Sequence, residues 1–431
     1  MKYCNYSCQT AEHILSRRGF LQTLGAATAG SALGSLGILS SPVLAAEMTR
    51  SQKRMLVINM AGGLSQLESW DPKPGTKTGG PFRAIPTSVP GIHISELLPR
   101  TAKVMHHLAL VRSINTSEDD HGKGDYYMLT GRRKTPAQDY PVIGAVVAKA
   151  LDAGNSALPG HIVITPGGGG GRNADSAYLG PRFSSVTLGN GAPPQFSNRP
   201  DSLTENASMC ANDLRRKVND RFALRRRTAE TEAYTQSYEQ GLELMRQREI
   251  FDLNKEPAAD RERYGSHDFG RHCLLARRLI EKGITYVRVT HSNYDTHNEN
   301  FNFHFEQLSE FDGPFANLVA DLFERGLLEH TMIVVLSEFG RTPNINPLYG
   351  RDHWSKSWSI CMGGVGLQKG AVIGKTNDVG MEVTERQVDA ASLFHTYLKG
   401  LGIKSNGHFT VAGQKMPMAD PAFEPVEELL A

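Results

Sequence analysis

Cysteine is scarce in this chain of 431 residues, which contains five, and only Cys210, Cys273 and Cys361 lie beyond the first 46 residues. These three stand far apart, in odd number and in no CxxC pair. That arrangement excludes the disulfide framework of a small secreted domain and the paired ligands of a zinc knuckle. We therefore interpret them as ordinary thiols.

An excess of charge of one sign is also missing. The chain has 47 Lys and Arg against 45 Asp and Glu, which gives a net charge of +2. Because nucleic-acid-binding proteins present a basic surface, this balance argues against a nucleic acid partner. The glycine run TPGGGGGRNA over 165–174 lacks the Lys-Ser/Thr of a phosphate-binding loop, so we interpret it as a loop at a rim.

Long apolar runs are missing too, and the nearest approach is a weak, glycine-rich run near the N-terminus. SRRGFLQ over 16–22 contains paired arginines, the Ala/Gly-rich run follows over 24–41, and small residues stand at 45–46. This order is typical of a twin-arginine export signal, whereas a buried core helix, the alternative, seldom contains so many glycines. We predict that the twin-arginine export machinery handles the chain and that residues 1–46 are removed. The product, residues 47–431, would be periplasmic or extracellular, without a stable membrane span.

Short apolar runs of strand length recur along the rest of the chain and alternate with helical patterns. The expected strands are RMLVINM (54–60), HHLALVRS (106–113), HIVIT (161–165), ITYVRVT (284–290), TMIVVL (331–336) and WSICMGG (358–364). The expected helices cover 142–154, 269–283 and 305–326. Such alternation predicts an α/β fold with a mostly parallel central sheet and helices on both faces. A charged stretch over about 201–264 predicts a helical insertion into this single domain.

Side chains that can bind a metal stand where these strands meet their loops. Asp295 and His297 follow one strand, Glu338 follows the next, and His353 lies in the polar loop that leads into another. Functional residues of parallel sheets cluster at the carboxyl edge, and carboxylates and imidazoles are common ligands of zinc and other divalent metals. A glutamate at the end of an apolar strand is costly unless it is paired or bound to a cation. We predict that these four residues form a metal centre.

Four strings, three of which contain these residues, resemble a known family. They are WDPKP (70–74), YDTH (294–297), SEFGRTP (337–343) and GRDHW (350–354). Together with the export signal, they are similar to the signature strings of exported bacterial proteins of unassigned function, a family related to sulfatases and placed in the alkaline phosphatase superfamily. The resemblance implies an alkaline phosphatase/sulfatase-like fold and descent from metal-dependent hydrolases.

The resemblance also implies which positions hold the metal. Asp295, His297 and His353 look like one metal site of that superfamily. Glu338 stands where its members have an aspartate, whereas Phe339 cannot replace the metal-binding residue that follows it. Asn59 stands where one or two aspartates are usual, so the chain is expected to hold a single divalent ion. Zinc is the expected ion, with calcium and manganese as alternatives.

His121 has an unusual place when it is compared with the resembled families. Sulfatases and alkaline phosphatases have their nucleophile one short helix before a Thr-Gly pair, and alignment on Thr130 and Gly131 puts His121 at that place. Because the residue is neither Cys, Ser nor Thr, formylglycine chemistry is excluded. His121 could attack an ester through a ring nitrogen, bind the metal or act as a general base, or be a structural residue of a site that has lost its reaction.

These features together predict a metal-dependent hydrolase of phosphate or sulfate esters that works without formylglycine. Arg341, Arg351 and Lys123 are candidate catalytic groups beside His121, because cationic side chains and a helix N-terminus bind anionic oxygens. The substrate would be a small-molecule ester or, by analogy with sulfatases, a polysaccharide ester. The alternative is an exported binding or scaffold protein that keeps the fold without turnover.

Overall fold

A nine-stranded sheet runs through the computed structural model, which describes residues 52–152, 158–168, 170–193, 199–225 and 229–431. The predicted export signal over 1–46 lies outside these residues. From edge to edge the strands are β13 (Val372–Ile373), β4 (Leu108–Ile114), β12 (Trp358–Gly364), β9 (Thr331–Leu336), β1 (Arg54–Met60), β8 (Tyr286–His291), β5 (His161–Thr165), β7 (Val186–Gly189) and β6 (Gly170–Arg172). β12 is antiparallel to both neighbours and β6 to β7, while the other pairs are parallel. The predicted α/β fold with a mostly parallel sheet is thus confirmed.

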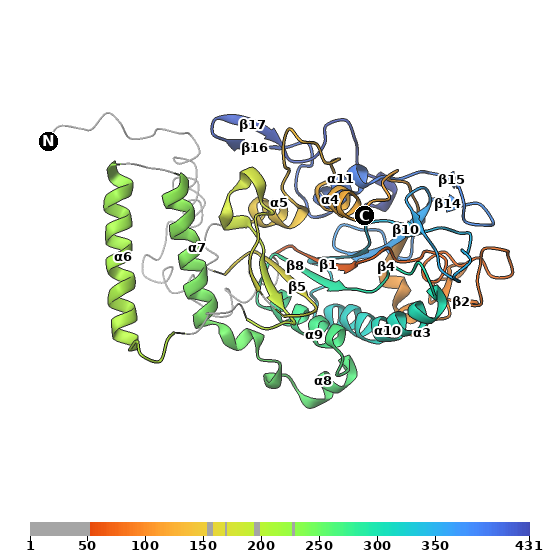
Figure 1. The fold of residues 1–431 in the computed structure, drawn as a ribbon, viewed down its shortest axis with the longest axis horizontal. Helices are drawn as coiled ribbons and strands as arrows, with labels where there is room; N and C mark the ends of the chain where they lie inside the picture. The colour runs from red at the N-terminus through yellow and green to blue at the C-terminus, as the bar shows by residue number, and fades with distance from the viewer. Residues whose placement is uncertain (1–51, 153–157, 169, 194–198, 226–228) are drawn as a thin grey trace, which may run out of the picture. The chain divides into compact units, whose positions relative to one another are not determined.

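Helices cover both faces of this sheet, as Figure 1 shows. One face carries α3 (Pro99–Val104), α9 (Asp268–Glu281) and α10 (Asn300–Glu324), and the other carries α4 (His121–Thr130), α5 (Ile143–Ala150) and α11 (Ala390–Gly400). Strand β1 contributes Leu56 and Ile58 to the first face and Met55 and Val57 to the second. A strand that is buried on both faces needs apolar residues at every position, which explains its continuous apolar run.

Helix α10 begins at Asn300, before the apolar pattern that starts at Phe305. Two polar residues of its first turns, Asn300 and His304, are fully buried. Asn300 donates a hydrogen bond to Glu68 (3.0 Å), and the Nε2 atom of His304 accepts one from the backbone N–H of Ser65 (3.1 Å). These partners lie more than 200 positions away in the sequence, so no local apolar periodicity could indicate this part of the helix.

Smaller elements surround the sheet. The stretch over 201–264 contains α6 (Glu205–Arg225), α7 (Ala229–Arg246) and α8 (Ala258–Tyr264). Two-stranded sheets pair β2 (Ala84–Pro86) with β3 (His93–Ser95), β10 (Gly340–Arg341) with β11 (His353–Trp354), β14 (Lys375–Thr376) with β15 (Val383–Glu385), and β16 (His408–Val411) with β17 (Gln414–Pro417). Cys273 and Cys361 are free thiols in the core and Cys210 is exposed. In the part of the chain that the structure describes, no helix has the length and apolar character needed to cross a membrane.

One edge of the sheet gathers the loops that carry the predicted site residues. Strands β1, β4, β8 and β9 run in the same direction, so their carboxyl ends lie at the same edge. Strand β12 runs the opposite way and therefore begins at this edge. The loop before β12, which carries His353, is thus brought to the loops that follow the parallel strands.

Candidate metal centre

Three histidines at this edge have their Nδ1 atoms bound to acceptors. The contacts are His121 Nδ1 to Glu338 Oε1 (2.8 Å), His297 Nδ1 to Asp352 Oδ1 (2.8 Å) and His353 Nδ1 to the carbonyl oxygen of Asp119 (2.7 Å). A carboxylate or carbonyl oxygen can only accept, so each Nδ1 atom carries the proton and donates it. A neutral ring with its proton on Nδ1 has a free lone pair on Nε2, which is the form that binds metals.

The three Nε2 atoms turn toward the carboxylate of Asp295. The nitrogens of His297 and His353 lie 3.1 and 3.2 Å from its Oδ1 atom. The nitrogen of His121 lies 3.4 Å from Oδ2, and the Nε2 atoms of His297 and His353 are 3.1 Å apart. Donor atoms of His121, Asp295 and His353 all lie within 4.8 Å of one another. Sequence reasoning placed three of these residues in the metal's ligand set, and the structure brings His121 to the same point.

The chemistry of this donor set is that of ligands for a divalent metal ion such as zinc. Neutral rings with the proton on Nδ1 would direct lone pairs at one another and at the carboxylate across 3.1 to 3.4 Å, and a cation between them would turn this repulsion into bonds. Tetrahedral zinc with ligands at about 2.0–2.1 Å separates neighbouring ligand atoms by about 3.3 Å, close to these distances. Calcium prefers six to eight oxygen ligands, whereas three nitrogens and one carboxylate suit zinc.

Asp295 is held in place by a buried arginine. The guanidinium of Arg341, which is fully buried, lies 2.5 Å from Oδ1 of Asp295. Arg341 also donates to the backbone carbonyls of Gly62 and Gly63. Burial by itself would raise the pKa of Asp295, but the hydrogen bond and charge of Arg341 lower it to about 2. Arg341 therefore keeps the carboxylate ionised and oriented toward the histidines.

Glu338 binds the Nδ1 side of the His121 ring. Its Oε1 atom accepts the Nδ1 proton of His121 and also the backbone N–H of Gly62 (2.8 Å), and Ser337 donates to Oε2 (3.1 Å). The sequence predicts Glu338 among the metal ligands and leaves His121 open as a nucleophile, a metal ligand or general base, or a structural residue. The geometry suits the metal-ligand alternative for His121, whose ring is oriented by Glu338. A carboxylate that orients a ligating histidine is a recurrent feature of zinc sites.

Two glycines that the sequence analysis did not single out allow the loops to approach. Gly62 has a φ of +115°, and a Cβ atom there would lie 2.5 Å from the backbone nitrogen of Asp295. A Cβ atom on Gly350 would lie 1.9 Å from the carbonyl oxygen of His297. Both positions therefore require glycine. Their signal in the sequence is glycine in the loop after β1 and in the GRDHW string, which becomes meaningful only once the partner loops are known.

Lys123 and Arg351, two other predicted catalytic groups, have different surroundings. Lys123 is exposed in the first turn of α4, where its backbone N–H is capped by Asp120 (3.0 Å). Arg351 is fully buried; its Nε and Nη2 atoms bind the Glu68 carboxylate at 3.0 and 2.7 Å, and Nη1 donates to backbone carbonyls. Every nitrogen of Arg351 has a partner inside the protein. We therefore assign Arg351 a structural role and do not include it among the groups that bind substrate.

Two large apolar side chains are exposed in a loop that is hydrogen-bonded to the centre. Leu348 and Tyr349 are 63% and 68% exposed in the loop between β10 and β11. Asn346 ties this loop to the site, because its side-chain amide donates to the carbonyl of His297 (2.8 Å) and to Asp352 (3.3 Å). Exposed apolar side chains next to a polar centre are suited to contact the organic part of a ligand.

The role of Glu338 can be tested by the conservative change Glu338→Gln. A glutamine keeps the shape, but its amide cannot replace a carboxylate as the acceptor that polarises His121. Loss of such a partner typically lowers metal affinity about 10- to 100-fold, and we expect a decrease of this size in a competition titration with a chromophoric chelator. Glu424→Gln, at an exposed position, is the matched control. Unchanged zinc affinity in Glu338→Gln would contradict the supporting role.

Comparison with known proteins gives a family and several similar folds. The family described as "Protein of unknown function (DUF1501)" matches residues 52–430. Among curated proteins, no sequence matches the chain. Similar solved structures include the PsFucS1 sulfatase from Pseudoalteromonas sp. (14% identity, TM-score 0.39, covering 85% of this chain and 70% of that chain). The zinc complex of the C-terminal periplasmic domain of EcEptC from Escherichia coli is also similar (12% identity, TM-score 0.40, covering 87% of this chain and 88% of that chain). So is a protein in the alkaline phosphatase superfamily from Vibrio parahaemolyticus (10% identity, TM-score 0.36, covering 82% of this chain and 68% of that chain). The assignment of the site therefore depends on the geometry of this chain.

Proposed function

The chain belongs to the DUF1501 family of proteins of unknown function, and we propose that it is a zinc-dependent hydrolase of phosphate or sulfate esters. The observation that carries this proposal is the meeting of three imidazole Nε2 atoms with the carboxylate of Asp295 at the carboxyl edge of the sheet. Zinc is the ion that this set of donors favours.

The centre is open enough for a substrate. The side chains of His121, Asp295 and His297 are 41%, 47% and 47% exposed. Structural zinc sites are closed by four protein ligands, whereas catalytic sites keep a position for water or substrate and can expand to five ligands. Exposure of this degree favours a catalytic centre.

The chain's own residues supply orientation and charge. A divalent ion bound here would act as a Lewis acid on a phosphoryl or sulfuryl oxygen. His121 has its Nδ1 atom occupied by Glu338 and offers Nε2 to the ion, so neither nitrogen remains to attack the substrate. We therefore propose direct attack by water and not a covalent intermediate on His121. Lys123 and the N-terminus of α4 favour an anionic substrate at this place.

The two exposed apolar side chains and the export signal complete the proposal. Leu348 and Tyr349 would contact the organic part of the ester, which is either a small molecule or a polysaccharide. The string SRRGFLQ supports export by the twin-arginine route, which would put the enzyme in the periplasm or outside the cell. The rival proposal, an exported binding or scaffold protein that keeps the fold without turnover, is supported by the absence of Cys, Ser or Thr at position 121.

Metal content and turnover separate these proposals. We expect the zinc-loaded wild type to hold about one zinc ion per chain and to hydrolyse 4-nitrophenyl phosphate or 4-nitrophenyl sulfate, with activity lost on chelation and restored by zinc. His121→Ala should lower kcat/KM by a factor of at least about 100. His408→Ala, which changes an exposed histidine of β16, should leave both properties unchanged.

Two outcomes would count against the enzyme. A wild-type protein that binds zinc through these residues and hydrolyses neither class of ester, including a panel of sulfated and phosphorylated saccharides, would favour the binding protein. A wild-type protein that binds no zinc after loading and hydrolyses neither class of ester would exclude the zinc-dependent hydrolase and leave the binding or scaffold protein.

A further inference from the structure

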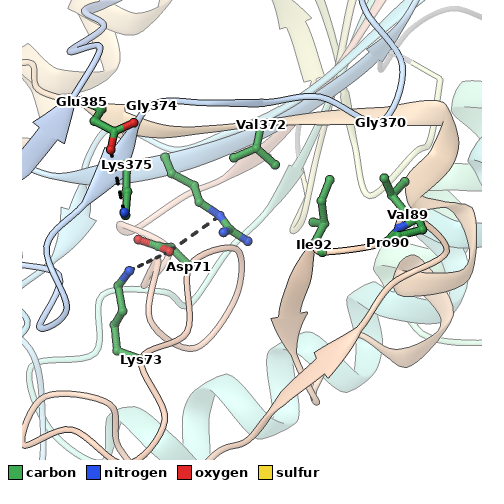
Figure 2. Close-up of a pocket in the computed structure, with 12 residues that line it drawn as sticks. Asp71, Lys73, Val89, Pro90, Ile92, Gly370, Val372, Gly374, Lys375 and Glu385 are labelled. Carbon is green, nitrogen blue, oxygen red and sulfur yellow. Dashed lines mark hydrogen bonds and ion pairs between the residues drawn. The ribbon is translucent and has the colours of Figure 1, made fainter.

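A second cavity lies away from the metal centre. It has a volume of about 530 Å³, within the usual range of about 300–1,000 Å³ for small-molecule sites. Its wall is built from the edge strand β13, the neighbouring strand β4, the β2–β3 connection and the β14–β15 hairpin, and it contains none of the residues of the metal centre. Figure 2 shows charged side chains at one end and aliphatic side chains at the other.

The carboxylate of Asp71 lies at the charged end of the cavity, where three neighbouring side chains bind it. Thr376 donates to its Oδ2 atom (2.5 Å), the Lys73 ammonium lies 3.0 Å from Oδ1, and the Arg112 guanidinium lies 3.7 Å from the same oxygen. Asp71 is 4% exposed. This carboxylate fixes the positions of the Lys73 and Arg112 side chains. Because the two cations neutralise its charge, it would repel an anionic ligand only weakly.

Two of the three guanidinium nitrogens of Arg112 are bound to backbone carbonyls. Its Nε and Nη2 atoms donate to the backbone carbonyls of Trp70 (2.9 Å) and His93 (2.5 Å). Within the described residues, Nη1 has no hydrogen-bond partner. A guanidinium that is oriented by two carbonyls and presents a further N–H to a cavity is prepared to bind an anion with little loss of side-chain entropy.

The cavity has an excess of positive charge. Lys73, Arg112 and Lys375 line it together with two carboxylates, those of Asp71 and Glu385. Lys375 and Glu385 are 3.8 Å apart and their side chains are 64% and 66% exposed, so this pair is weak. Figure 2 shows the Lys375 ammonium directed toward the end that contains Asp71. One additional anion in the cavity would balance the charge.

The opposite end is aliphatic. Val89, Pro90, Ile92 and Val372 form it, and no aromatic ring is among the lining residues. A site for sugar rings commonly offers aromatic faces, whereas a wall of branched aliphatic side chains gains free energy from burying alkyl groups. The two ends together therefore suit an amphipathic ligand, which has one anionic end and one alkyl end.

We propose that this cavity binds a small aliphatic monocarboxylate. The carboxylate would lie among Arg112, Lys375 and Lys73, and the alkyl chain would lie along Val89, Ile92 and Val372. This proposal is independent of the hydrolase activity, because the two sites share no residue.

Octanoate is the probe, and calorimetric titration of the zinc-loaded full chain is the measurement. We expect saturable binding of one octanoate and none of octylamine, which has the opposite charge. Lys375→Gln should weaken binding about fivefold and Glu385→Gln should strengthen it by a similar factor, because the two changes remove opposite charges at a partly exposed position. Lys415→Gln, at an exposed position on β17, is the matched control.

Because Lys375 and Glu385 are exposed, these variants should fold like the wild type, which thermal melting verifies. Octanoate binding should also persist in Asp295→Asn, the variant that disables the metal centre. Absence of saturable binding, equal binding of octylamine, or an identical affinity in Lys375→Gln and Lys415→Gln would overturn the proposal. So would binding that disappears in Asp295→Asn, because octanoate would then be a ligand of the zinc.

Discussion

Asp295→Asn is expected to lower zinc affinity more than 100-fold and to abolish ester hydrolysis. The Asp295 carboxylate is the only anionic donor among the four proposed ligands and contacts all three histidines. An amide oxygen of the same shape has no net charge, and even indirect partners of a zinc ligand are worth about 10- to 100-fold in affinity. Competition with a chromophoric chelator measures the affinity, and the release of 4-nitrophenol measures the hydrolysis.

The fold should survive this change. Arg341 loses its anionic partner but keeps the carbonyls of Gly62, Gly63 and Arg351 as acceptors. We therefore expect cooperative melting in Asp295→Asn and a smaller gain in melting temperature on addition of zinc than in the wild type. Asp378→Asn changes an exposed aspartate and is the control. If Asp295→Asn bound zinc as tightly as that control, the metal would have to lie elsewhere.

Glu68→Gln is expected to have the largest effect on stability. Glu68 and Arg351 are both fully buried, with Oε1 to Nη2 at 2.7 Å and Oε2 to Nε at 3.0 Å. Removal of one partner from a buried pair leaves the other charge uncompensated and typically costs about 3–5 kcal/mol. We expect a decrease of this size in the free energy of unfolding by urea, with Glu424→Gln as the surface control.

The same pair predicts how stability depends on pH. Burial raises the pKa of Glu68, but Arg351 and His304 outweigh it, and the pKa lies below its usual value. Because the folded-state pKa is lowered, the stabilisation is complete above the pKa of the unfolded chain and is lost as the pH falls through the folded-state value. The difference in unfolding free energy between wild type and Glu68→Gln should therefore shrink in acid. If the unfolding free energies of wild type and Glu68→Gln differed by less than about 1 kcal/mol at neutral pH, the ion pair of Glu68 and Arg351 would contribute no more than an exposed pair does. That result would contradict its burial.

Glu68→Gln should also affect the metal centre. The backbone carbonyl of Arg351 accepts a hydrogen bond from Nη1 of Arg341 (3.0 Å), and Arg341 holds Asp295. Displacement of Arg351 would therefore disturb Asp295 through one intermediate residue. We expect a modest loss of zinc affinity in Glu68→Gln, well below the loss in Asp295→Asn.

The sequence by itself determined the layers of the fold and three of the four proposed ligands. The strands β1 and β9 are buried at every position and consist largely of apolar residues, so a local pattern indicates them. Strand β8 is indicated by its β-branched and aromatic residues, although Arg288 and Thr290 are half-buried within it. Asp295 and His297 follow β8 directly. Parallel strands end at one edge of a sheet, so their position along the chain was sufficient to predict their position in space.

Only the tertiary structure decided which of these side chains contact one another. His353 reaches the site because β12 is antiparallel and begins at that edge, and no local pattern gives the direction of an isolated strand. His121 and Glu338 are separated by 217 positions, and Arg351 and Glu68 by 283. A buried charge and a surface charge look alike in a sequence, because burial is set by residues that are distant along the chain. For this reason the contact between His121 and Glu338, the burial of Arg351 and the cavity beside β4 and β13 became visible only in the folded protein.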